Sequence, residues 1–190
     1  MSSQTESEKL APGALAVVQE FVNTAHLDRG EDELERPEDL REWLASHDLV
    51  EPGAEVGDAD LRRAIEVREG LRALLATHNG AEIDAAAHTR LERVAGRATM
   101  RATFTPAGPR LAPSAKGADA GLASLLAIVA TAQADGTWPR LKACADDSCL
   151  WAFFDHSKNR RGRWCSMAVC GNRAKARAHR ARQSPGATSS

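Results

Sequence analysis

The arrangement of four cysteines constrains the fold of this 190-residue chain more than any other feature. Cys144 and Cys149 are separated by four residues, as are Cys165 and Cys170, and fifteen residues lie between the two pairs. Two close pairs joined by such a spacer can converge on one tetrahedral ion, and four thiolates suit Zn²⁺ in a closed structural site. The spacing therefore predicts one Zn²⁺ ion and a small module that needs the metal to fold.

Three other interpretations of the cysteines stay open at this point. They are four unrelated buried thiols, an iron–sulfur cluster, or a catalytic zinc site. The first is disfavoured because no cysteine occurs elsewhere in the chain, and the second because the spacing is more typical of a closed structural site. A catalytic zinc needs an open ligand position and usually His or carboxylate ligands, and His156 in the spacer could replace one cysteine.

The second cysteine pair also predicts local structure. Cys165 and Cys170 are five residues apart, so in the middle of a helix their side chains would point about 140° apart. They can share one ion only if the chain turns between or just before them. Either Cys165 precedes the helix that we expect over residues 166–182, or the helix starts nearer Cys170. In the first case, Ser166 is a suitable N-cap residue.

Charge is distributed unevenly along the chain. Residues 1–140 hold 15 Lys and Arg against 23 Asp and Glu, whereas residues 141–190 hold 10 against 3. The N-terminal residues form no apolar signal core, and the charge-free stretch between Asp119 and Asp135 is too short for a membrane span. We therefore expect a cytoplasmic protein with no membrane partner, in a compartment where thiols stay reduced.

The rest of the chain is expected to be mainly helical. Aromatic residues make up only 4% and there is no Tyr, so the core must consist of aliphatic side chains, which favours helices. Apolar periodicity, Pro37 and the Asn79-Gly80 stop signal predict helices over residues 12–27, 37–46, 58–78, 81–95 and 117–134. Residues 28–36 are interpreted as an acidic connection. Alternation over 98–104, a turn at 106–109 and a return strand at 110–112 predict a hairpin.

These elements define the expected fold class and domains. The fold class is mainly α: a helical N-terminal domain with a small β-hairpin, followed by a Cys₄ zinc-finger module that ends in a basic helix. The expected boundaries are 10–136 for the helical domain, 137–182 for the finger and 183–190 for a disordered tail.

The C-terminal end attracts anions. From His156 onward there are nine Lys and Arg residues and no acidic residue. One or two cations would offset the charge of a zinc–thiolate site, so the excess favours binding to phosphate, and the first partner we expect is double-stranded DNA. The candidate DNA contacts are Arg160, Arg161, Arg163, Asn172, Arg173, Lys175, Arg177 and Arg180. Asn172 either touches a base or closes the turn after Cys170.

Two further functions compete with DNA binding. Five of the eight aromatic residues lie between Trp138 and Trp164, where they either form a small core around the metal or stack on bases. An RNA-binding zinc module would need exposed aromatics such as Trp151 or Phe154. The other competitor is a protein-interaction finger whose arginines meet an acidic partner without binding nucleic acid.

A family resemblance rests on the segment around the second cysteine pair. Residues 163–175, which include Cys170-Gly171-Asn172-Arg173, resemble the signature of the CGNR zinc-finger family. Upstream residues that also fit this family are Cys144, Cys149, Phe153, Asp155, Ser157 and Asn159. The finger resemblance covers about residues 138–182. It implies four cysteine zinc ligands and DNA binding by the finger.

The N-terminal part is similar to the ABATE domain that usually precedes this finger. The likeness rests on Phe21-Val22-Asn23-Thr24 and on Leu40 and Trp43-Leu44, and it covers about residues 10–135. Family members often have Asp before the first of these segments, where this chain has Glu20. The resemblance implies a bacterial protein of a family described as stress-induced regulators of transcription.

A regulator needs an input, and the N-terminal domain is the candidate for it. Arg68 lies on an otherwise apolar helical stripe and Asn23 lies in the first helix. A small anionic effector held by Arg68 and Asn23 is one hypothesis, against a plain structural role for both. A homodimer through the helix at 117–134 is another possible role. We expect no enzyme activity, since the sequence contains no recognisable catalytic motif.

Overall fold

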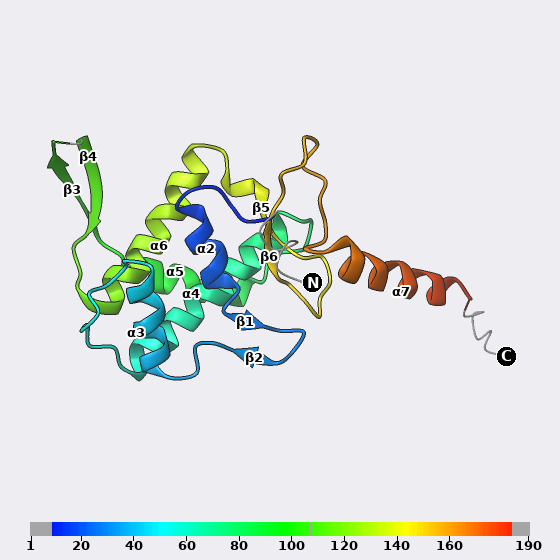
Figure 1. Ribbon diagram of the computed structural model, residues 1–190, viewed down its shortest axis with the longest axis horizontal. Coiled ribbons are helices and arrows are strands. Elements are labelled where there is room, and N and C mark those ends of the chain that lie inside the picture. Colours follow the sequence, from blue (N-terminus) through cyan, green and yellow to red (C-terminus); the bar gives the residue numbers. More distant parts are fainter. Residues whose placement is uncertain (1–8, 107, 184–190) are drawn as a thin grey trace.

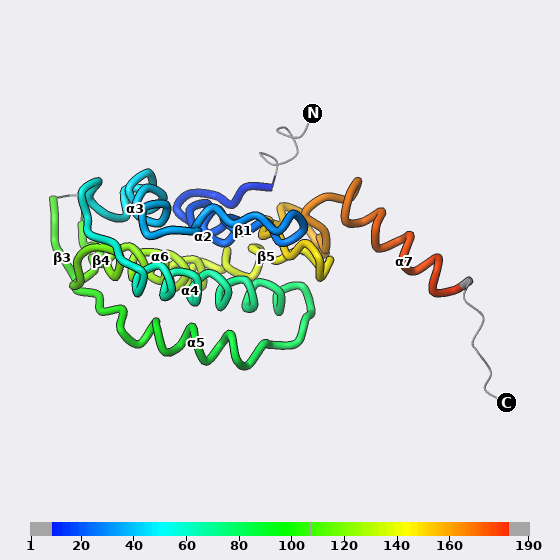
Figure 2. Tube along the Cα trace, turned by 90° about the horizontal axis from the view of Figure 1, so that it is seen from below, coloured from blue at the N-terminus to red at the C-terminus, as the bar shows by residue number. Residues whose placement is uncertain are grey.

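The computed structural model describes residues 9–106 and 108–183 of the chain. The helices of the N-terminal part are α2 (Leu15–Val22), α3 (Pro37–Ser46), α4 (Asp58–Thr77), α5 (Ala85–Ala95) and α6 (Gly117–Ala134). They stack in layers, with α2 and α3 on one side of α4 and α6 and with α5 on the other (Figures 1 and 2). The described part of the chain ends in a short turn of helix, η2 (Met167–Gly171), and in α7 (Asn172–Gln183).

Three antiparallel strand pairs connect and flank these helices. They are β1 (Ala25–His26) with β2 (Glu31–Asp32), β3 (Met100–Thr105) with β4 (Gly108–Pro113), and β5 (Leu141–Ala143) with β6 (Ala152–Phe154). The β3–β4 hairpin stands out from the body at one end of the molecule, and α7 projects from the other end (Figure 1). The predicted fold class is confirmed: a mainly helical N-terminal part with a small hairpin, and a C-terminal cysteine module ending in a basic helix.

The core lies where α2, α3, α4 and α6 meet. Most of its side chains are aliphatic, as the composition predicts, and its buried aromatic members are Phe21, Trp138 and Phe154. Those that are completely or almost completely buried include Val18, Phe21, Leu40, Leu44, Leu71, Leu75 and Leu125. This extensive apolar burial is the main force that stabilises the N-terminal part.

Helix α6 is a core helix of this part. By length and composition alone, its 18 residues would suffice to cross a membrane. In the structure it packs against α2, α3 and α4, and residues such as Leu122 and Leu125 lie in the common core. Packing inside the protein therefore explains the buried third of α6, while Leu126, Ile128 and Val129 pack against the core and are partly exposed.

Several element boundaries differ from the sequence-based predictions for local reasons. The predicted helices 37–46 and 117–134 are confirmed by α3 and α6. The fourth helix begins at Ala85, not residue 81, because the Asp84 carboxylate accepts hydrogen bonds from the N–H groups of Ala86 and Ala87. The expected acidic connection at 28–36 contains β2, which pairs with β1.

Two predicted segments fall partly outside the described residues. Residue 107 of the expected hairpin turn lies outside them, although strands β3 and β4 confirm the hairpin around it. Of the expected disordered tail, residue 183 ends α7, whereas residues 184–190 lie outside the described part of the chain.

The C-terminal module is not packed as an independent unit. Leu141 and Ala143 of β5, with Ala152 and Phe154 of β6, belong to the same apolar core as the N-terminal helices. A separate, smaller cluster consists of Cys144, Cys149, Cys165, Cys170, Trp151 and Trp164. Of the aromatics expected around the metal, only two therefore pack there.

Candidate metal centre

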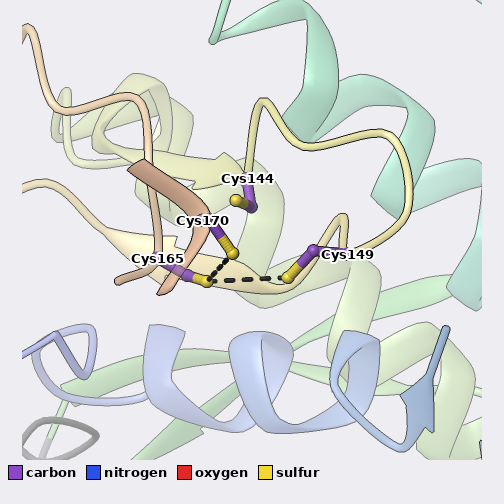
Figure 3. A group of neighbouring side chains, drawn as sticks. All are labelled: Cys144, Cys149, Cys165 and Cys170. Atoms are coloured by element: carbon purple, nitrogen blue, oxygen red, sulfur yellow. Dashed lines mark hydrogen bonds between the residues drawn. The ribbon is translucent and has the colours of Figure 1, made fainter. Parts of the chain in front are cut away.

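The four cysteine side chains converge on one point. Their Sγ atoms all lie within 4.8 Å of one another, although the two pairs come from distant turns (Figure 3). The Sγ–Sγ distances are 3.6 Å from Cys149 to Cys165 and 3.7 Å from Cys165 to Cys170. A tetrahedron with Zn–S bonds of about 2.3 Å has edges of about 3.8 Å. The sulfur positions therefore fit a tetrahedral zinc ion.

A tight turn brings the first pair together. Cys144 follows directly after β5, and its N–H donates to the carbonyl oxygen of Trp151 at 2.9 Å. The N–H groups of Cys149 and Leu150 both donate to the carbonyl oxygen of Asp146. Leu150 has a φ of 47°, in the left-handed region that few non-glycine residues adopt. The turn folds the two thiols towards each other.

The second pair brackets the start of a helix. Ser166 is the N-cap of η2, and its hydroxyl oxygen accepts a hydrogen bond from the N–H of Val169. The N–H groups of Cys170 and Gly171 donate to the carbonyl oxygen of Ser166. Cys165 thus precedes the helix, which is one of the two predicted arrangements. One wide helical turn separates its thiol from that of Cys170 and lets both face the same point.

The metal-free cluster can hold little negative charge. A hydrogen bond with Cys149 lowers the pKa of the Cys144 thiol, and the same interaction raises the pKa of Cys149. The pKa of Cys165 is raised by its hydrogen bond with Cys144, and burial raises that of Cys170. Four thiolates can coexist here only beside a cation, and Zn²⁺ supplies the charge that stabilises all four.

A buried carboxylate lies beside the metal cluster. Asp146 is 1% exposed and holds the first cysteine turn through hydrogen bonds from Ser148. Its Oδ2 has no hydrogen-bond partner in the structure. Arg173 and Arg177 lie at 3.8 Å and 3.4 Å from its two oxygens. These arginines compensate the Asp146 charge and connect α7 to the cysteine turn.

The loop between the cysteine pairs is held by a second buried ion pair. Lys142 Nζ lies 2.9 Å from Asp155 Oδ2 and also donates to the carbonyl oxygens of Arg160 and Gly162. Burial alone would raise the pKa of Asp155, but hydrogen bonds from Ser157 and Lys142 outweigh burial and lower the pKa to about 2. This network positions the loop without any contribution from the metal.

Polar side chains of the N-terminal part hold the module in place. The Asn23 amide accepts from Ala152 N at 2.7 Å and donates to Ala152 O at 2.9 Å, in the manner of a neighbouring strand. Asn79 at the end of α4 donates to the carbonyl oxygens of Ala143 and Arg163. These contacts fix the module on the helical body from two sides.

Buried Arg72 adds a third link that the sequence analysis missed. It donates to the carbonyl oxygen of Val22 at 2.6 Å and to that of Leu150 at 3.4 Å. Burial lowers its pKa from the ordinary arginine value. The sequence did contain a signal for this role. Arg72 is a second cation, four residues after Arg68, on a helix predicted to face the core.

The predicted DNA contacts differ in exposure. Those that are exposed are Arg160, Arg161, Arg163, Asn172, Lys175, Arg177 and Arg180. Arg173 is half-buried against Asp146. Asn172 donates from Nδ2 to the carbonyl oxygen of Ala168 at 3.0 Å, so its amide closes the turn after Cys170, one of the two roles considered for it.

The two predicted effector residues do not meet in one site. Arg68 is 3% exposed, and its guanidinium donates to both Asp32 oxygens at 2.7 Å and 2.6 Å, to Thr24 and to Glu69. An anion at Arg68 would therefore have to displace the Asp32 carboxylate, which comes from the expected acidic connection. Asn23 is occupied by Ala152.

The fold and the metal centre define a class: a helical protein with a C-terminal zinc finger of four cysteine ligands. Comparison with known families agrees with this class. Residues 140–183 match the CGNR zinc finger, and residues 15–136 match ABATE, described as "Putative stress-induced transcription regulator". The chain belongs to the ABATE family, as the resemblance in its sequence predicted. Comparison with curated proteins found no match.

Proposed function

We propose that the protein is a zinc-dependent, double-stranded-DNA-binding transcriptional regulator of the cytosol. The observation that carries this proposal is α7, a basic helix that projects from the body into solvent (Figure 2). Its twelve residues include five Lys and Arg and no acidic residue. The metal centre fixes the start of α7, so metal binding and presentation of the helix are coupled. No catalytic step is part of this proposal.

The two flanks of α7 have different surroundings. Arg173 and Arg177 face the Asp146 carboxylate, which partly compensates their charge. At 100° per residue, Lys175 and Arg182 lie on the opposite flank. Both are exposed, and this flank is the one that we assign to phosphate contacts.

Burial of the aromatic residues favours duplex DNA over single-stranded RNA. Phe153 and Phe154 are 1% and 4% exposed, so neither ring is available for stacking on a base. Trp151 is half-buried and packs against the His26 ring at a centroid distance of 4.7 Å. A platform of exposed rings, which single-strand binding uses, is not supported by these positions.

Binding of zinc-loaded protein to random-sequence duplex DNA, measured by fluorescence anisotropy over a salt series, tests the proposal. We expect metal-dependent binding that weakens steeply as salt rises, because each phosphate contact releases counterions. The double variant Lys175→Ala/Arg182→Ala should reduce the salt slope by about 2.

Arg101→Ala/Arg110→Ala is the matched control for this variant. It removes the same charge from two exposed residues of the β3–β4 hairpin, at the other end of the molecule. This control should leave the slope unchanged. Absence of duplex binding at low salt would reject DNA as the partner and favour a protein-interaction finger.

A further inference from the structure

A cavity of about 680 Å³ lies between the C-terminal module and the N-terminal body. One side is formed by α2, α3 and the β1–β2 loop, and the other by residues 149–153 and 165–173. Its volume is typical of small-molecule sites, which often lie where two parts of a protein meet. Of the two effector residues expected from the sequence, Asn23 lines this cavity and Arg68 does not.

An indole, an imidazole and a carboxylate form a connected unit on the α2–α3 side of this cavity. The Trp43 ring stacks on that of His47, with centroids 4.1 Å apart and an interplanar angle of 26°. His47 Nε2 lies 2.9 Å from Glu20 Oε2. Trp43 and Glu20 both line the cavity.

A second unit of the same composition spans the cavity, with Trp151 on the module side and His26 and Glu33 on the β1–β2 side. The Trp151 ring lies 4.7 Å from that of His26, at an interplanar angle of 41°. His26 Nε2 lies 3.3 Å from Glu33 Oε1. All three residues line the cavity. Two aromatic rings, each with a carboxylate nearby, are groups that attract organic cations.

The pairing of the charged residues in the lining also favours a cation. Three cations and three carboxylates line the cavity. Each cation has a partner: Lys9 donates to Trp164 O, Arg29 pairs with Glu31, and Arg173 pairs with Asp146 and Asp28. Within the described part of the chain, the ion pairs of Glu20 and Glu33 are with imidazoles, which are charged only when protonated. Three of the four cysteines line the same cavity, and a zinc ion with four thiolates carries a net negative charge.

We propose that this cavity binds a small organic cation. Its apolar body would lie against the rings of Trp43 and Trp151, and its ammonium group would face Glu20 and Glu33. The same carboxylates, together with the zinc–thiolate centre, exclude anions. This site adds a ligand to the protein and does not depend on DNA binding.

Three probes with the same ring and different charge test the inference: 2-phenylethylamine, 2-phenylethanol and phenylacetate. Isothermal titration calorimetry with the zinc-loaded full chain at pH 7 should show that the amine binds about tenfold more tightly than the alcohol. Phenylacetate should bind most weakly. Equal affinities, or tighter binding of phenylacetate, would overturn the proposal.

Substitutions of residues in the lining test whether the amine binds in this cavity. The double variant Glu20→Gln/Glu33→Gln should weaken amine binding about tenfold and leave binding of the alcohol unchanged. Glu38→Gln/Glu42→Gln is the matched control, because it removes the same charge from two exposed residues of α3 that are not part of the lining. Bound zinc and circular dichroism verify that each variant is folded. Unchanged amine affinity in the double variant, or an equal loss in the control, would contradict the assigned site.

Discussion

The helical body and the C-terminal module are stabilised in different ways. In the body, side chains such as Phe21, Leu71 and Leu125 are almost completely removed from water. The module instead combines a cluster of thiols with buried polar contacts, among them the Lys142–Asp155 pair. The comparison shows that a small module can be positioned accurately with little apolar surface of its own, if a larger neighbour and a metal supply the remaining contacts.

Removal of the metal should have the largest effect. It should unfold parts of the C-terminal module while the helical body stays folded. Chelation leaves buried thiols without their cation, so we expect residues 144–150 and 163–183 to lose order. Helices α2 to α6 and strands β5 and β6 should persist, because both strands belong to the main core. Hydrogen–deuterium exchange with and without chelator measures this division. Unchanged protection of residues 163–183 would show that the module does not depend on metal.

A large-to-small substitution in the core of the helical body should destabilise the protein without releasing zinc. Leu71 is 1% exposed, so Leu71→Ala should lower the free energy of unfolding of the body by about 2–5 kcal/mol. Leu27 is 44% exposed, and Leu27→Ala should have a much smaller effect. Urea denaturation followed by circular dichroism, with the zinc content checked at zero urea, gives both values. A similar loss in both variants would argue against the assigned core.

Loss of the Asn23 amide should weaken the junction between the two regions. Asn23→Ala leaves the Ala152 N–H without its partner and removes one of the two side-chain donors to the Ala152 C=O, the other being Gln19, at a cost of about 1–3 kcal/mol. We expect faster amide exchange at β6 and in the cysteine turns, with α4 and α6 unaffected. Native-state hydrogen exchange measures this change. Equal acceleration throughout the protein would show that Asn23 supports global folding instead.

The smallest expected effect is the loss of the Asp155–Lys142 ion pair on acidification. The pKa of Asp155 is lowered, so its stabilising contribution is complete above the ordinary value of 3.8 and is lost as the pH falls through about 2. Protons displace zinc from thiolates at higher pH, so the Asp155–Lys142 pair should outlast the metal centre. A ¹³C NMR titration of the Asp155 carboxyl group measures the midpoint. A midpoint at or above 3.8 would contradict the assigned network.

Much of the fold could be predicted from local sequence signals. Pro37 at the start of α3 and the apolar residues of α6 gave correct helix boundaries, because capping and periodicity act within a few residues. Strands β1 and β5 could not be predicted in this way. They are two and three residues long, and contacts with distant partners determine whether they form.

The metal site was predictable, but the role of several polar residues was not. Cysteine spacing alone identified the ligands, since tetrahedral coordination restricts where thiols can lie. Arg68 was recognised as unusual on its helix, yet its partner Asp32 lies 36 residues away in a segment without an expected structure. Asp146 is a similar case, because nothing in its local sequence indicates burial beside Arg173 and Arg177.

The projection of α7 has a mechanical consequence. Twelve residues of helix are about 18 Å long, and Arg173 and Arg177 in the first half of α7 face Asp146 of the cysteine turn. A rotation of the helix at the metal centre therefore also moves its far end. A tilt of about 10° there would move the far end of α7 by roughly 3 Å, about half the rise of one helical turn. Small rearrangements beside the cysteines are thus amplified along α7.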